Sequence, residues 1–503
     1  MFTETEEHPP IVSEPPGVEQ HYAPVESPVF AETWRFVRGH WRRMTSISAL
    51  LLAPCFWHRY IVAGDLDSHL YNAWLVQLIE RGQAPGLWIA RQWDNVLFDF
   101  LLSHLGNLFG LQAVERIAVS FSILVFFWGA FSLVSAAARR APWFLVPCLA
   151  MLAYGWTFMM GFFNYYLSLG LSLFTLALWW RGRGNERIFA LALAPLIWAA
   201  HPLGLIWFVG AAGYVALARI LPARTHIFLL VLSAAGLAAL GRYLSLHFPE
   251  AWTPVPGLAA NGSDQVFLYG PRYLVPTRFL LAFVIAGLLA DVLMRPRGKN
   301  AWKEYALPLQ LYVAAILGVS LLPGAIRLPQ FAAPITNLTQ RFSLPAAVLL
   351  CCLLGITRPR KWHLVGFATV AALYFSLLYQ DTAVLVRLEG QAERLVSPLP
   401  FGARVTSAIW TSSDLPLLSN HIVDRACIGR CFSVSNYEPS SGQFRVRASP
   451  GNPIVASNPD VSMAMQTGSY VARREDLPLY QIYLCERNTA NLCLRELSVG
   501  ATH

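Results

Sequence analysis

The chain has few charged side chains, and several common catalytic motifs are missing from it. Only 13% of its 503 residues are charged, against about 25% in an average soluble protein, whereas 55% are hydrophobic. The sequence contains no P-loop, no Gly-x-Gly-x-x-Gly fingerprint, no His-Glu-x-x-His and no Gly-x-Ser-x-Gly. These absences argue against an enzyme driven by a cytoplasmic nucleotide.

The N-terminal segment also lacks the features of a cleavable signal peptide. Residues 4–32 are acidic and rich in proline, with no basic start and no apolar stretch. Such a composition cannot bury enough apolar surface to fold. We therefore expect residues 1–33 to form a disordered cytoplasmic tail.

Long apolar runs recur between Met44 and Tyr379, and the mean hydropathy is +0.45. We predict a polytopic α-helical membrane protein with about eleven transmembrane helices over residues 34–379. The net charge of +9 comes from small Arg/Lys clusters between these runs. That pattern is typical of cytoplasmic loops and indicates a lipid bilayer, and not a nucleic acid, as the partner. It places the N-terminus in the cytoplasm.

Residues 380–503 have a different texture, with short apolar stretches separated by Pro, Ser, Asn and Gly. Alternating patterns at 443–447 and 479–484 predict strands, so we expect a small α+β or mostly β domain. The spacing of its four cysteines is poor for zinc and favours disulfides, which require an extracytoplasmic location. Local pairs are expected, with pairing across the domain as the alternative: Cys427 with Cys431 and Cys485 with Cys493.

The segment Gly64–His69 follows the first apolar run and contains Asp65 and Asp67. A carboxylate at a membrane–water boundary can act as a general base or bind a divalent metal ion, and solvated charge at a helix end is the alternative. Residues 64–115 would then form the first extracytoplasmic loop, with amphipathic helices lying in the membrane interface.

This arrangement resembles the GT-C superfamily of membrane glycosyltransferases, such as the protein O-mannosyltransferases and the aminoarabinose transferases. Only Gly64–His69 matches at the level of a motif; the rest of the resemblance lies in the order of loop, spans and exported domain. It implies transfer of a sugar from a polyprenyl-phosphate donor to a glycan, lipid or protein acceptor. It also implies that Asp65 or Asp67 is the catalytic base, with a divalent metal ion as a possible cofactor.

Candidate substrate-binding residues lie at the other predicted outer boundaries. Arginine suits a donor phosphate because its planar fork can bind two oxygens, although an arginine at a span end can also be an interfacial anchor. Other polar side chains in these loops could hydrogen-bond a sugar or phosphate. The set comprises His69, Asn164, Tyr165, His201, Arg272 and Arg341.

Two other functions fit the same layout. The chain could be a transporter or flippase for a lipid-linked glycan, or a non-catalytic protein of envelope assembly. Transporters commonly place ionisable residues near the membrane midplane, whereas these apolar runs are almost uncharged. The sequence therefore favours the enzyme, in a bacterial inner or plasma membrane.

Overall fold

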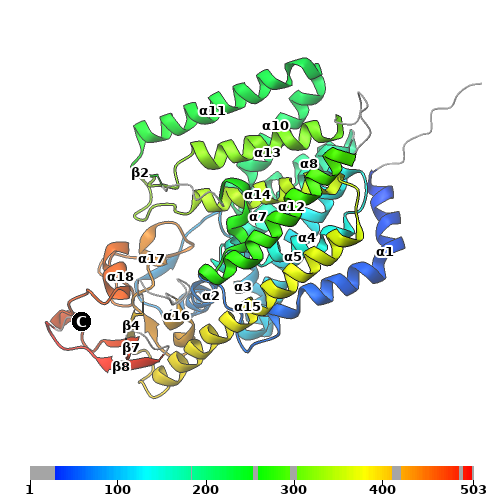
Figure 1. The fold of residues 1–503 in the computed structure, drawn as a ribbon. Helices are drawn as coiled ribbons and strands as arrows, with labels where there is room; N and C mark the ends of the chain where they lie inside the picture. Colours follow the sequence, from blue (N-terminus) through cyan, green and yellow to red (C-terminus); the bar gives the residue numbers. More distant parts are fainter. Residues whose placement is uncertain are drawn as a thin grey trace, which may run out of the picture.

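A computed structural model describes residues 29–182, 184–252, 259–294, 303–409, 421–486 and 491–500. The protein is mostly helical, with a small strand region near the C-terminus (Figure 1). Most of the predicted tail lies outside the described residues. The C-terminal end of the predicted tail differs from the prediction, because residues 29–33 already belong to helix α1 (Val29–Leu51).

Among the described residues, seven helical segments are long and apolar enough to cross a membrane, which confirms the predicted mostly helical fold and is compatible with a polytopic membrane protein. They include helices α4 (Leu111–Ala138), α10 (Pro202–Ile220), α11 (His226–His247), α12 (Leu274–Met294), α13 (Lys303–Leu321), α14 (Leu338–Ile356) and α15 (Lys361–Val396).

The first and fifth apolar runs do not form a single long helix in the described part of the chain. The first does not form one helix, because α1 ends at Leu51 and Pro54 follows within the short 3-10 helix η1 (Ala53–Cys55). Proline lacks the N–H that an α-helix needs to continue. The fifth run is divided between α8 (Asn185–Ala192) and α9 (Ala194–Ala200), each too short to cross a bilayer.

Helix α7 (Phe163–Arg181) forms the centre of the bundle, and thirteen of its nineteen residues are buried. It packs closely on α4 because both helices have glycine at the crossing. A Cβ atom on Gly129 would lie 2.4 Å from the carbonyl oxygen of Gly170. Small residues allow two helix backbones to approach in this way, and the close packing fixes the position of the first residues of α7.

The C-terminal region contains a four-stranded sheet in the order β5-β4-β7-β8. Its strands are β4 (Arg404–Ala408), β5 (Phe432–Ser433), β7 (Tyr480–Leu484) and β8 (Leu492–Glu496). Strand β4 is parallel to β5 and β7, and β8 is antiparallel to β7. With α16 (Ile422–Cys427), α17 (Glu438–Ser441) and α18 (Pro459–Gln466) beside it, the region is of the α+β type.

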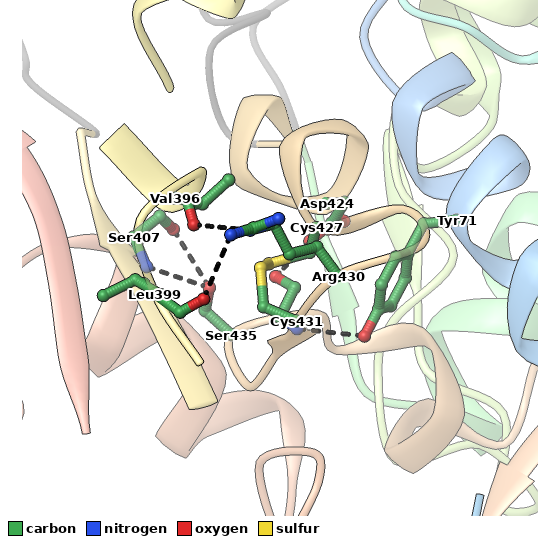
Figure 2. The surroundings of a disulfide bond; sticks show 10 residues. Tyr71, Val396, Leu399, Ser407, Asp424, Cys427, Arg430, Cys431 and Ser435 are labelled. Atoms are coloured by element: carbon green, nitrogen blue, oxygen red, sulfur yellow. Dashed lines mark hydrogen bonds between the residues drawn. A yellow bond between two sulfur atoms is a disulfide. The ribbon is translucent and has the colours of Figure 1, made fainter. Parts of the chain in front are cut away.

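Both local disulfides are present, as predicted. Cys427 is bonded to Cys431 and Cys485 to Cys493, with Cα atoms 4.5 and 5.2 Å apart. Figure 2 shows that the first bond joins a turn in which Arg430 donates hydrogen bonds to the carbonyl groups of Val396 and Leu399. The disulfide turn is therefore attached directly to the end of α15, which continues as one helix well past residue 379.

The first loop and the C-terminal region form one structure. Strand β1 (Leu87–Ile89) pairs with β6 (Val446–Ala448), and the hydroxyl of Tyr71 accepts a hydrogen bond from the backbone of Ser433 (Figure 2). Helix α2 (Leu66–Glu80) is covered as a result, and twelve of its fifteen residues are buried. This differs from the predicted interfacial helix, because the apolar side of α2 contacts protein.

Candidate functional site

A cavity of about 740 Å³ lies where the first loop, the helical bundle and the C-terminal region meet. Four helices begin at or beside its wall, because Asp65, Asn164, His201 and Arg341 all line it. Asp65 and His201 are the N-cap residues of α2 and α10, and the other two residues lie in the first turns of α7 and α14. Helix N-termini present free N–H groups and partial positive charge, so their convergence favours an anionic ligand.

The backbone of Asp65 is fixed by the turn before α7. The amide of Asp65 donates a hydrogen bond of 3.1 Å to the carbonyl of Met160, and that of Gly64 bonds the carbonyl of Met159. Gly161 has a φ of +80°, and a Cβ atom there would lie 2.3 Å from the amide nitrogen of Asp65. Only glycine fits at this position.

The carboxylate of Asp65 faces a buried histidine on its other side. His421 Nε2 lies 3.7 Å from Asp65 Oδ1, and His421 Nδ1 lies 2.7 Å from Asp424 Oδ2. Burial opposes protonation of His421, but its hydrogen bond to Asp424 and the nearby carboxylates outweigh burial and raise its pKa to about 10. The raised pKa favours a positive charge on His421, and its imidazole holds the carboxyl group of Asp65 in place.

Arg341 and His201 present adjacent hydrogen-bond donors. His201 Nδ1 accepts a hydrogen bond from the amide of Leu203, so a neutral imidazole carries its proton on Nε2. That Nε2 lies 3.3 Å from Arg341 Nη1, which is also a donor. Arg341 Nε is buried and has no hydrogen-bond partner among the described residues. The donors need a shared acceptor, which the oxygens of a phosphate would supply.

Aromatic rings hold Arg341 in this position. Its guanidinium lies over the ring of Phe162, 4.0 Å from the centroid, and the Tyr165 hydroxyl donates a hydrogen bond to its carbonyl oxygen. No carboxylate forms an ion pair with it among the described residues, although Asp65 is close enough to interact electrostatically. The cation is therefore fixed in place and still available to a ligand.

His69 and Asn164 are part of a hydrogen-bonded group at the cavity wall. His69 Nδ1 lies 2.7 Å from Asp99 Oδ1, and Asn164 donates to Asp99 Oδ2 at 2.8 Å. Burial opposes protonation of His69, but Asp99 outweighs it and raises the pKa of His69 to about 9. This group fixes the first turn of α3 (Leu97–Phe109) against α7 and adds a second imidazolium beside the cavity.

Asp67 faces away from the cavity into a buried ionic cluster. Its carboxylate lies 2.7 Å from Arg425, which also pairs with Glu115 and Glu389. All four side chains are at most 10% exposed, whereas that of Asp65 is 21% exposed and lines the cavity. The two aspartates of the motif therefore have different environments, and Asp67 has a structural partner.

Arg272 is not among the residues that line the cavity. It pairs with Asp381 of α15, which also accepts a hydrogen bond of 2.8 Å from Tyr273. The structure thus gathers five of the six predicted substrate-binding residues with Asp65, and it places Arg272 elsewhere. The described residues contain no cluster of three or more His, Cys, Asp or Glu side chains arranged to hold a metal ion.

The sequence analysis did not identify the cavity residues of the C-terminal region or those that follow β1. The segment 91–95 forms one wall, and Tyr437, Gln443 and Arg447 form another. No spacing pattern connects these segments with Asp65, because the pairing of β1 with β6 brings them together. The Tyr437–Gly442 stretch is rich in turn residues, and that composition was its only sequence signal.

Comparison of the chain with protein-family models, with curated proteins and with solved structures gives no match.

Proposed function

We propose that this protein is a GT-C-like glycosyltransferase that transfers a sugar from a polyprenyl-phosphate donor to an acceptor hydroxyl. The observation that carries the proposal is one cavity in which the carboxylate of Asp65 shares the wall with the adjacent donors of Arg341 and His201. A base and an anion site in one enclosed space are what this transfer requires.

In the proposed reaction Asp65 accepts the proton of the acceptor hydroxyl as its oxygen bonds to C1 of the sugar. The bond between C1 and the phosphate oxygen breaks, and polyprenyl phosphate leaves with the bonding electrons. Arg341 and His201 donate hydrogen bonds to the phosphate as its charge increases. Donors already oriented by protein contacts stabilise developing charge without reorganisation.

The lining of the cavity suits a lipid-linked substrate. Trp198, Leu203 and Ile206 form an apolar side, and Trp198 and Ile206 are also exposed on the helical surface. The opposite side carries polar residues of segment 91–95. A polyprenyl chain would lie along α9 and α10, and the acceptor would approach past segment 91–95. The cavity, the disulfides and the C-terminal region would face the extracytoplasmic side.

The test uses the purified full chain in nanodiscs with a panel of radiolabelled polyprenyl-phosphate monosaccharides. Release of polyprenyl phosphate and transfer of label to a membrane acceptor fraction are measured for wild type, Asp65→Asn and Arg341→Gln. We expect Asp65→Asn to lower the rate about 10²- to 10⁴-fold, the usual value of a general base. Arg341→Gln should weaken binding of undecaprenyl phosphate as well.

Asp460→Asn is the control, because Asp460 is exposed and is not among the residues that line the cavity. It should retain most of the wild-type rate. Binding of the lipid phosphate without release from any donor would instead support a transporter or flippase. An Asp65→Asn variant as active as wild type would exclude Asp65 as the base.

A further inference from the structure

The N-terminal half of α1 has an exposed face with two tryptophans and three arginines: Trp34, Arg35, Arg38, Trp41 and Arg42, together called the basic face. The exposed fractions of the two tryptophan side chains are 67% and 56%. Large aromatic side chains in water are costly when they gather on one surface, and such patches mark sites of interaction. None of the residues of the basic face lines the cavity.

Helical geometry places these residues on one side of α1. Position 38 lies four residues after position 34, and positions 41 and 42 lie three and four residues after position 38. Residues at these separations share one face of a helix. Phe36 and Ile47 lie on the other side, where they pack against the hydrophobic core. The basic face is therefore turned outward because its opposite side is occupied by the bundle.

Two contacts fix α1 at the end of the bundle that lies away from the C-terminal sheet. Glu32 forms an ion pair of 2.9 Å with Arg181 at the end of α7, and Arg43 lies over the ring of Trp143, 4.2 Å from its centroid. Figure 1 shows α1 and the strands β4, β7 and β8 at opposite ends of the molecule. The basic face thus lies near the C-terminal ends of helices α4 and α7, which carry Arg139 and Arg181.

We propose that the basic face docks on the headgroups of anionic phospholipids in the leaflet opposite the cavity. Tryptophan favours the headgroup level, since its ring is apolar and its N–H needs a polar partner. Arginine binds phosphate oxygens through two parallel hydrogen bonds. Side chains of both kinds on one face match the chemistry of an anionic membrane surface, and α1 is not among the helices apolar enough to cross the bilayer. This proposal is independent of the proposed function.

The experiment measures hydrogen exchange of residues 29–43 by mass spectrometry, with the full chain in nanodiscs. One set contains phosphatidylcholine alone, and the other contains 30% phosphatidylglycerol. Each arginine near an anionic surface contributes about a fivefold preference, so we expect exchange to slow by about tenfold or more in the anionic discs. Added salt of about 0.5 M should remove most of this difference because it screens exposed charges.

The variant Arg35→Gln/Arg38→Gln/Arg42→Gln should exchange at the same rate in both lipids. Arg473→Gln/Arg474→Gln is the control, because it removes exposed positive charge from the C-terminal region and should retain the wild-type difference. Equal exchange of the wild type in the two lipids would overturn the proposal. So would a lipid difference that persists in the triple variant, since another part of the chain would then be responsible.

Discussion

Asp65 and Asp67 are two residues apart, yet one lines an open cavity and the other lies in a sealed ionic cluster. The cavity holds the Nε donor of Arg341, which is buried and has no hydrogen-bond partner among the described residues, with His201 beside it. The cluster places three carboxylates around one guanidinium, that of Arg425. Side-chain direction rotates by about 100° per residue in a helix, so Asp65 and Asp67 point to nearly opposite sides of the start of α2 and have different surroundings. Charge that stabilises the fold lies in a closed cluster, whereas the carboxylate of Asp65 and the guanidinium of Arg341 border a cavity that a ligand can enter.

The largest expected effect comes from breaking the sealed cluster. Arg425→Met leaves three buried carboxylates without their cation, and removal of one partner of a buried pair costs about 3–5 kcal/mol. We expect a large fall in the midpoint of thermal unfolding in detergent. Arg59→Met is the control. Arg59 and its partner Glu393 are both well exposed, and an exposed ion pair contributes about 1 kcal/mol or less to the free energy of unfolding. Equal effects of the two variants would refute the distinction.

The second prediction concerns pH. Burial raises the pKa of Asp67 to about 6 in spite of its ion pair with Arg425. Because the pKa of Asp67 is higher in the folded protein than its ordinary value of 3.8, protonation of Asp67 stabilises the folded state. This contribution to the free energy of unfolding is complete below pH 3.8 and is lost as the pH rises through 6. The loss should amount to about 3 kcal/mol. Asp67→Asn should flatten the curve of stability against pH between about 4 and 7, whereas the exposed Asp460→Asn should leave its shape unchanged.

The smallest effect on stability is expected at the turn that positions Asp65. Gly161→Ala places a Cβ atom against the amide of Asp65, whereas Gly429→Ala meets no atom within 4 Å at a similar positive φ. Both variants should lose about 1–2 kcal/mol from backbone strain, and Gly161→Ala should lose somewhat more because its Cβ atom meets the backbone of Asp65. Only Gly161→Ala should increase hydrogen exchange at residues 64–66 and lower sugar transfer. If Gly429→Ala did the same, the contact with Asp65 would not be the cause.

Local features of the site and fold were predictable from the sequence, and long-range ones were not. The disulfides join cysteines four and eight residues apart, and β7 forms within the predicted strand at 479–484, because both features depend on neighbouring residues. The amphipathic pattern of α2 could not indicate whether its apolar side meets lipid or protein. The partner of Asp67 lies 358 residues away, so no spacing argument could find Arg425.

The pairing of the first loop with the C-terminal region has a consequence for biosynthesis. Tyr71 and Ser433 are 362 residues apart in the chain. At a synthesis rate of about 5–20 residues per second, the loop waits roughly 20–70 s for the segments that cover it. During that interval α2 and its aspartates are uncovered and the cavity has no far wall. If the cavity carries the proposed activity, a nascent chain halted before residue 421 would lack one wall of the cavity and should transfer no sugar.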